Sequence, residues 1–322
     1  EVFKPFGVDF EFKLSGSLPT HEYCVQYRET DFNFISRLFE REGLYYYFKH
    51  EAAKHTLVVV NAPGAHAKCP GGHKFRFRTA ADRGLDEEPI TEWSSQREMQ
   101  PGKWPLPDYN FETPKTSLLQ STKSAVPSAS EKLEFYDYPG DYDKAADGGR
   151  YVKLRSEQGD ARHALVRGGG STRTMACGYQ FELAEHPDAT ENVAHLVLAT
   201  EIGMGIGGYE SGAGDDYFQC RFMAAPASVQ FRAERITPKP HIAGPHTATV
   251  VGPAGDEIDV DKYGRVKIQF HWDRLGKNDA DSSCYVRVSQ PSAGKGWGMV
   301  WLPRIGQEVV VDFLEGDPDR PL

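Results

Sequence analysis

Three short motifs contain the residue types that could do chemistry. The run GMGIGG at 203–208 matches the G-x-G-x-x-G fingerprint through Gly203, Gly205 and Gly208. A dinucleotide site needs a helix directly after this fingerprint, because the helix N-terminus holds the pyrophosphate. Here a loop-like stretch and then a strand-like pattern follow the glycines. We therefore interpret the motif as part of a long hairpin connection.

The second motif, HAKCPGGH, offers His66, Cys69 and His73 as metal ligands. Structural zinc sites take four ligands, and no fourth cysteine or histidine lies nearby, so a loop without metal is the favoured interpretation. The third, RGGGST at 167–172, lacks the lysine of a phosphate-binding loop. The sequence contains no G-x-S-x-G elbow and no H-E-x-x-H helix, while the spacing of paired carboxylates is decided only in the fold. We predict no catalytic residue, no cofactor and no metal.

Composition narrows the class of protein further. The 322 residues carry a net charge of -9, which gives no bulk support for binding nucleic acid through its phosphates. Five widely spaced cysteines without a C-x-x-C pair, and no signal-like start, predict a cytoplasmic origin without disulfides. The chain starts at Glu1 in a pattern typical of a domain interior and stops on a turn-forming cluster, so we expect missing sequence at both ends.

The elements that position these motifs begin with TDFNFISRLFEREGLYYYF at 30–48. Thr30 can cap a helix whose apolar residues fall on one face, and Gly43 ends it. The aromatic run 44–48 then predicts a strand. We expect the Phe and Tyr rings of 32–48 to pack in a core, and an exposed platform for bases or sugars is the alternative.

Residues 74 to 238 predict mostly short antiparallel strands, because apolar and polar residues alternate. One helix is expected near 149–166, although Gly159 weakens that prediction. The proline-rich segment 234–245 predicts a linker. The expected strands lie at 74–78, 132–138, 179–186, 195–203, 217–224 and 228–234.

The last part, 246–322, shows no helical pattern and several short strands at 266–270, 284–288, 299–302 and 308–313. This is the size of an OB-type barrel. The glycine-rich segment 290–298 leaves no room for the usual OB helix, which would be a departure from that fold. The predicted fold class is thus mainly β with an α+β portion.

Several segments together resemble the VgrG family, the spike proteins of the bacterial type VI secretion system, which are related to hub and spike proteins of contractile phage tails. The carriers are residues 23–48, 101–114, 261–279 and 284–322, which include DKYGRVKIQFHWDRLGKND and GWGMVWLPRIGQEVVVDF. The resemblance implies a phage-hub-like region at 1–238, with its first barrel missing upstream, a linker at 239–244, and an OB-type barrel at 245–322 as the neck before a β-helix spike.

The resemblance also implies a function. In the family, three chains form a spike that caps the Hcp tube, contacts the baseplate, and carries a PAAR-type tip protein or effectors into a target cell by mechanical puncture. Such a protein waits in the bacterial cytoplasm and is secreted without a signal peptide. The alternative is a phage-tail-like hub that carries a cell-wall hydrolase, and a nucleic-acid-binding OB protein is disfavoured by charge.

Trp297, Met299 and Trp301 are our candidates for the trimer interface. They lie among glycines and apolar residues rather than lysines and arginines. A cyclic homo-oligomer would bury such residues in a repeated interface. The alternative is that the two tryptophans fill the core of their own barrel.

Overall fold

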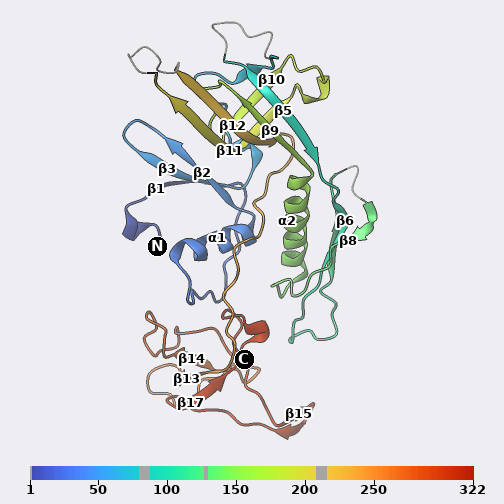
Figure 1. The fold of residues 1–322 in the computed structure, drawn as a ribbon. Helices are drawn as coiled ribbons and strands as arrows, with labels where there is room; N and C mark the ends of the chain where they lie inside the picture. The colour runs from blue at the N-terminus through green and yellow to red at the C-terminus, as the bar shows by residue number, and fades with distance from the viewer. Residues whose placement is uncertain (1, 80–87, 127–129, 208–215) are drawn as a thin grey trace. The chain divides into compact units, whose positions relative to one another are not determined.

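The protein is described by a computed structural model in which strands dominate (Figure 1). It forms two compact units, of which the first comprises Glu1–Ser17 and Leu38–Ile236 and the second Leu18–Arg37 and Thr237–Leu322. Each unit has a buried apolar core of its own. The residues described are 2–79, 88–126, 130–207 and 216–322.

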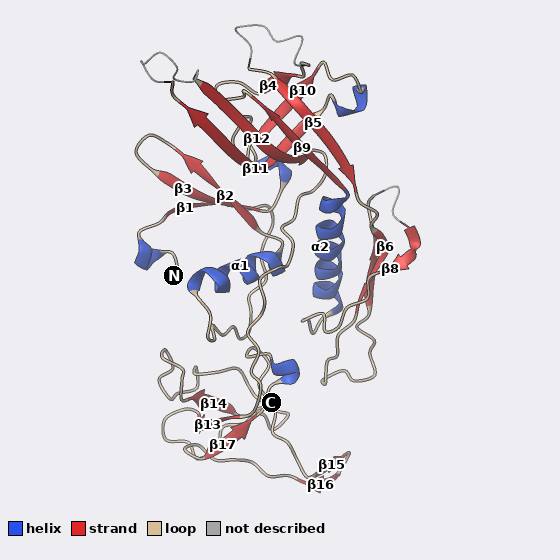
Figure 2. Ribbon diagram, in the orientation of Figure 1, coloured by secondary structure: helices blue, strands red, loops and turns tan. Residues whose placement is uncertain are grey.

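The first unit is built on a curved six-stranded sheet with the order β4-β10-β11-β12-β9-β5 (Figure 2). Only β4 and β10 pair in parallel, and the other neighbours are antiparallel. Four predicted strands, at 74–78, 179–186, 195–203 and 217–224, are confirmed here with shifted ends. The bounds are β4 Lys74–Arg76, β5 Ile90–Arg97, β9 Ala164–Gly170, β10 Gln180–Ala184, β11 Ala194–Gly205 and β12 Tyr217–Pro226.

The predicted helix and aromatic strand are both present. Helix α1 spans Asp31–Glu42, and the Thr30 hydroxyl accepts a hydrogen bond from the Asn33 backbone N–H at 3.1 Å. Gly43, at φ 72°, ends it in the left-handed region that favours glycine. Strand β2, Tyr45–His50, follows and pairs with β3, His55–Val60, which in turn pairs with β1, Asp9–Lys13.

The aromatic rings of this region divide between core and surface. Tyr45 and Tyr47 are buried against Val58 and Val60, which confirms core packing for these two. Phe32 and Phe48 are exposed, so the prediction was wrong for them. Residues of a strand alternate between two faces, and the face carrying Phe48 is only partly covered.

Helix α2, Ala145–His163, packs on a small sheet of β6 Pro101–Leu106, β7 Gln120–Lys123 and β8 Ser130–Glu134. The helix was predicted at 149–166, and its last residues instead begin β9. Gly159 lies inside the helix, at a position where the Cβ of any other residue would meet the Trp104 ring at 2.4 Å. The glycine that weakened the prediction is therefore required by close packing.

Two predicted strands are corrected. Segment 228–234 forms no strand and runs as a loop, in which Phe231 packs on the Tyr45 ring and the Arg232 guanidinium donates to the Gly43 and Asn61 carbonyls. Alternating residues here serve packing and side-chain hydrogen bonds instead of a sheet ladder. Segment 132–138 is strand only in its first half, where β8 ends at Glu134.

The second unit contains the sheet β14-β13-β17 over an apolar core. The strands are β13 His246–Val251, β14 Lys267–Phe270 and β17 Glu308–Val311. The predicted strand at 284–288 is reduced to a single bridge between Val266 and Val286. The glycine-rich segment 290–298 folds as a hairpin of β15, Ser292–Gly294, and β16, Trp297–Met299, where we expected no helix.

A histidine in the core of the first unit predicts a pH dependence. His195 is buried between the Trp93 and Phe181 rings, and burial lowers its pKa below the ordinary value of 6.5 despite the nearby Glu191. As pH falls through about 6.5, the unfolded chain takes up a proton that the folded core resists.

We expect the free energy of unfolding to fall between about pH 7.5 and pH 5.5, and to fall less in His195→Phe. Denaturant titrations across this range measure the effect. The matched control Leu275→Phe introduces the same side chain at an exposed residue that does not titrate, and should keep the wild-type slope. An unchanged slope in His195→Phe would assign the pH dependence to other groups.

Candidate assembly surface

The three predicted interface residues lie together on the hairpin of β15 and β16. We call Trp297, Met299, Val300 and Trp301 the hairpin surface. The antiparallel register places Gly294 opposite Trp297 and Ser292 opposite Met299. Gly298 has φ 126°, and a Cβ there would meet the Ser292 carbonyl oxygen at 2.5 Å, so only glycine allows this close pairing.

Local contacts fix both tryptophans. The Trp297 indole lies over Gly294, where a Cβ would meet the ring at 2.1 Å. The Gln290 side chain accepts from the Trp301 backbone N–H at 2.7 Å and donates to its carbonyl at 3.0 Å. A glycine contact thus positions the Trp297 ring and the Gln290 side chain positions the Trp301 backbone, while both rings are exposed.

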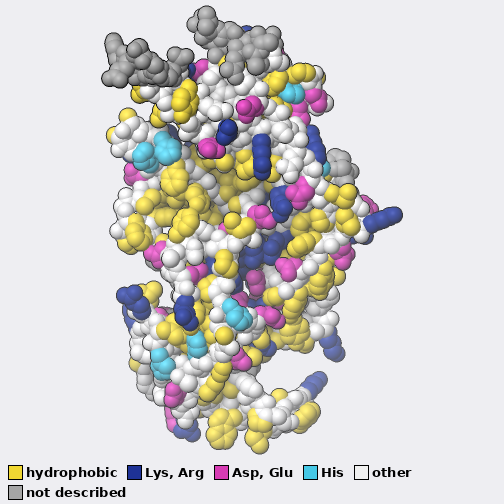
Figure 3. Space-filling view, in the orientation of Figure 1, with side chains coloured by type: hydrophobic (Ala, Val, Ile, Leu, Met, Phe, Trp, Pro, Cys, Tyr) yellow, Lys and Arg dark blue, Asp and Glu magenta, His cyan; other side chains and the backbone are white. Residues whose placement is uncertain are grey.

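The hairpin surface is strongly exposed. The exposed fractions are 67% for Trp297, 57% for Met299 and 72% for Trp301, and none of the three belongs to the buried core of the second unit. Hydrophobic side chains gather in the space-filling view where Figure 1 labels β15 (Figure 3). Contiguous exposed apolar residues mark interaction sites, since covering each large side chain contributes roughly 1.5–3 kcal/mol. The assembly role itself stays a prediction.

Sequence reasoning missed a neighbouring signal. Val300 and Val310 are as exposed as the tryptophans, at 71% and 73%. Val310 lies in the uninterrupted valine run of β17, where strict alternation would have placed a polar residue on the outer face. An apolar residue at an outward position of a predicted strand is the signal that could have indicated this exposed apolar surface.

The structure separates the three metal-ligand candidates. His66 is buried and contacts the Tyr45 hydroxyl and the Gly178 carbonyl, each at 2.8 Å, and burial lowers its pKa. Cys69 lies in the core of the first unit, where burial raises the pKa of its thiol. The His73 ring instead contacts the Lys68 amine at 3.2 Å. In the described ranges no group of three or more His, Cys, Asp or Glu side chains is placed to hold a metal ion.

The glycine motifs have structural roles. Gly203 and Gly205 lie in β11, which pairs with β12 as an antiparallel hairpin and confirms that interpretation, while Gly208 lies outside the described residues. The glycines of RGGGST belong to β9. A Cβ at Gly168 would meet the Phe222 ring at 2.3 Å, and one at Gly170 would meet the Pro89 carbonyl oxygen at 2.1 Å.

The six-stranded sheet carries an open cavity of about 540 Å³, lined from β5, β9, β11 and β12. One row across it holds Glu92, Arg221 and Glu201, with Gly169 between the first two. These three charged side chains are solvent-exposed. Among the described residues that line this cavity, no nucleophilic side chain is hydrogen-bonded to a base. The row therefore supports no catalytic assignment.

No helix in the described part of the chain has the length and apolar character needed to cross a bilayer.

Comparison with known families agrees with this architecture. Residues 1–205 match the phage tail baseplate hub (GPD) family, and residues 247–322 match the type VI secretion system/phage-baseplate injector OB domain. The fold and the order of the two matched regions thus define a tail hub followed by an injector OB domain. The resemblance noted in the sequence is confirmed: the chain belongs to the VgrG family of spike proteins.

Relatives support the assignment over the whole chain. Type VI secretion system spike protein VgrG1a of Pseudomonas aeruginosa is 44% identical over 100% of this chain and 50% of its own length. Actin cross-linking toxin VgrG1 of Vibrio cholerae is 36% identical over 98% of this chain and 29% of its own. The chain thus spans half or less of these relatives.

A solved structure shows the same fold. The E. coli c3393 protein, a component of the type VI secretion system with structural similarity to the T4 bacteriophage tail proteins gp27 and gp5, aligns with a TM-score of 0.61. The match covers 98% of this chain and 65% of that one at 18% identity. A hub sheet followed by an OB unit is therefore the fold of this chain.

Proposed function

We propose that this chain is the hub and OB part of a trimeric type VI secretion spike. The observation that carries the proposal is that a hub-family region and an OB-family region occur together in one chain. The OB unit also exposes an apolar hairpin. In this role the protein caps the Hcp tube, contacts the baseplate, and bears a PAAR-type tip protein or effectors through parts outside this sequence. It waits in the cytoplasm and is delivered outward by the secretion system.

The buried cores support a mechanical role. Force transmission requires densely packed units, and each unit has fully buried aromatic and branched side chains. We propose no intrinsic catalysis and no nucleic-acid partner. The ranges 1–238 for the hub-like region, 239–244 for the linker and 245–322 for the OB-type barrel remain our proposal, although segment 18–37 and the linker pack with the second compact unit.

Trimer assembly is tested on the full-length protein. Trp297→Asp or Trp301→Asp should convert the trimer to monomer at micromolar concentration, because a buried unpaired carboxylate is costly in an apolar interface. Light scattering measures the mass, and circular dichroism reports whether the fold is kept.

The matched control is Leu275→Asp, which changes a residue 88% exposed in the same unit but away from the hairpin. It should leave the trimer intact. A monomeric wild-type protein, or a trimer that tolerates both tryptophan changes, would contradict the proposed surface.

Absence of catalysis is tested separately. Peptidoglycan, nucleotides and model esters incubated with the purified chain should remain unchanged. Turnover that disappears with a single carboxylate substitution, such as Glu92→Gln, would favour the alternative of a phage-tail-like hub with cell-wall hydrolase activity.

A further inference from the structure

One segment of the second unit comes from far away in the sequence. Leu18–Arg37, which we call the strap, belongs to this compact unit although more than half the chain separates it from Thr237. The match to the injector OB domain begins only at residue 247 and leaves the strap out. The chain therefore passes between the units three times, after Ser17, Arg37 and Ile236.

Residues 21–29 of the strap have the burial pattern of a half-covered extended strand, and residues 31–37 form the first turns of helix α1. His21, Tyr23, Val25, Tyr27 and Glu29 are turned inward to different degrees, while every residue between them is exposed. Period-two alternation of this kind places one face against a neighbour. The structure forms no regular ladder here, so side chains must provide the attachment.

Aromatic packing holds the middle of the strap. The Tyr27 ring packs on the core of the second unit, edge-on to Trp272 with ring centroids 5.5 Å apart and beside His246 at 5.8 Å. The Trp272 indole N–H donates to the His246 ring at 3.2 Å. Such aromatic pairs contribute about 0.5–1.5 kcal/mol beyond the area they bury.

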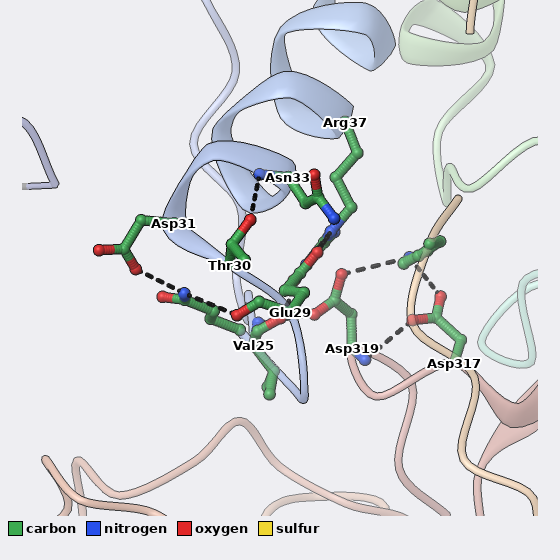
Figure 4. Close-up of polar contacts among 10 residues, drawn as sticks. Val25, Glu29, Thr30, Asp31, Asn33, Arg37, Asp317 and Asp319 are labelled. Carbon is green, nitrogen blue, oxygen red and sulfur yellow. Dashed lines mark hydrogen bonds and ion pairs between the residues drawn. The ribbon is translucent and has the colours of Figure 1, made fainter. Parts of the chain in front are cut away.

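A buried ion pair inside the strap holds its shape (Figure 4). The Arg37 guanidinium donates to both Glu29 carboxylate oxygens, at 2.7–3.1 Å, and to the Val25 carbonyl at 2.8 Å. The exposed fractions of the Arg37 and Glu29 side chains are only 6% and 5%. Removing one partner of such a buried pair is strongly destabilising, because the other charge stays buried without compensation.

The strap is also tied to the end of the chain. The Val25 backbone N–H donates to the Asp319 carboxylate at 2.7 Å, across 294 positions of sequence. Lys239 pairs with that carboxylate at 3.2 Å and with Asp317 at 2.5 Å. Figure 4 shows Asp319 between the strap and Asp317. One carboxylate thus joins three separate parts of the second unit.

We propose that the strap is an integral element of the OB unit, docked through Tyr27 and the Val25–Asp319 hydrogen bond and held in shape by its internal Glu29–Arg37 pair, so that the OB sheet keeps its stability only while the strap is bound. The occupant of this docking surface is the chain's own segment 18–37. This rests on contacts within the second unit and is independent of the proposed secretion function.

The test uses hydrogen exchange on the full chain. In Arg37→Leu, amides of β13 and β14 should exchange at least about 100-fold faster, because the strap loses the shape in which Tyr27 and Val25 reach the rest of the unit and leaves a buried Glu29 charge unpaired. Amides of β11 and β12 in the first unit should stay within about threefold of wild type. The control Lys123→Leu breaks a pair exposed by 70% and 66% and should change neither sheet.

A milder pair of variants keeps the test decisive if Arg37→Leu does not fold. Asp319→Ala removes the acceptor for Val25 and should accelerate exchange in β13 and β14 by roughly tenfold. Asp319→Asn keeps an acceptor oxygen and should have the smaller effect. Faster exchange confined to the strap, with β13 and β14 unchanged, would overturn the proposal, as would an equal rise in both units.

Discussion

Phe181→Ala is expected to lower the free energy of unfolding of the first unit by about 3–5 kcal/mol. Phe181 is 1% exposed, stacks on His195 with ring centroids 5.4 Å apart, and meets the Phe222 ring edge-on at the same distance. Alanine removes the central ring of this cluster, and the surrounding hydrogen-bonded strands cannot collapse to fill the cavity.

Denaturant titration together with hydrogen exchange in β12 measures this loss. The matched control is Phe6→Ala, the same chemical change at a residue 64% exposed, which should stay within about 0.5 kcal/mol. Exchange in β13 of the second unit should be unaffected, because each unit has its own core. An equal loss in both sheets would show that the units unfold together.

Gly178→Ala is expected to cost roughly 3 kcal/mol or more, which is large for a single added methyl group. Gly178 has φ 82°, in the left-handed region, and a Cβ there would meet the buried Tyr47 ring at 2.2 Å. The Gly178 carbonyl also accepts from buried His66, so the backbone cannot shift without losing that contact.

The control Gly203→Ala places a methyl group where the nearest atom is 3.9 Å away and should be neutral within about 0.5 kcal/mol. Thermal and denaturant unfolding of both variants measure the difference. If the two substitutions had equal effects, Tyr47 would be free to move and the close packing would carry no energetic weight.

Both predictions concern the region that the family relationship assigns to the hub. Its stability comes from rings and glycines that fit each other, such as Gly168 beneath Phe222. A part that transmits force must resist such local openings, which is the property that these substitutions would measure.

The sequence by itself determined the local elements and the family. The cap at Thr30, the stop at Gly43 and the alternating strands at 179–186 and 195–203 depend on neighbours within a few residues, and the structure keeps them. The OB-type end was recognisable because its motifs are long and continuous in sequence.

The tertiary structure alone decided which segments share a unit and which apolar residues face outward. Residues 228–234 alternate like a strand but serve as a loop, and the strap alternates without having been recognised. Trp301 is exposed, although a large apolar side chain of this kind is equally compatible with a buried core. The physical reason is the sequence separation over which the interactions act. Periodicity and caps depend on residues a few positions apart. The hydrogen bond from Val25 to Asp319 joins residues 294 positions apart, and no local pattern encodes such a contact.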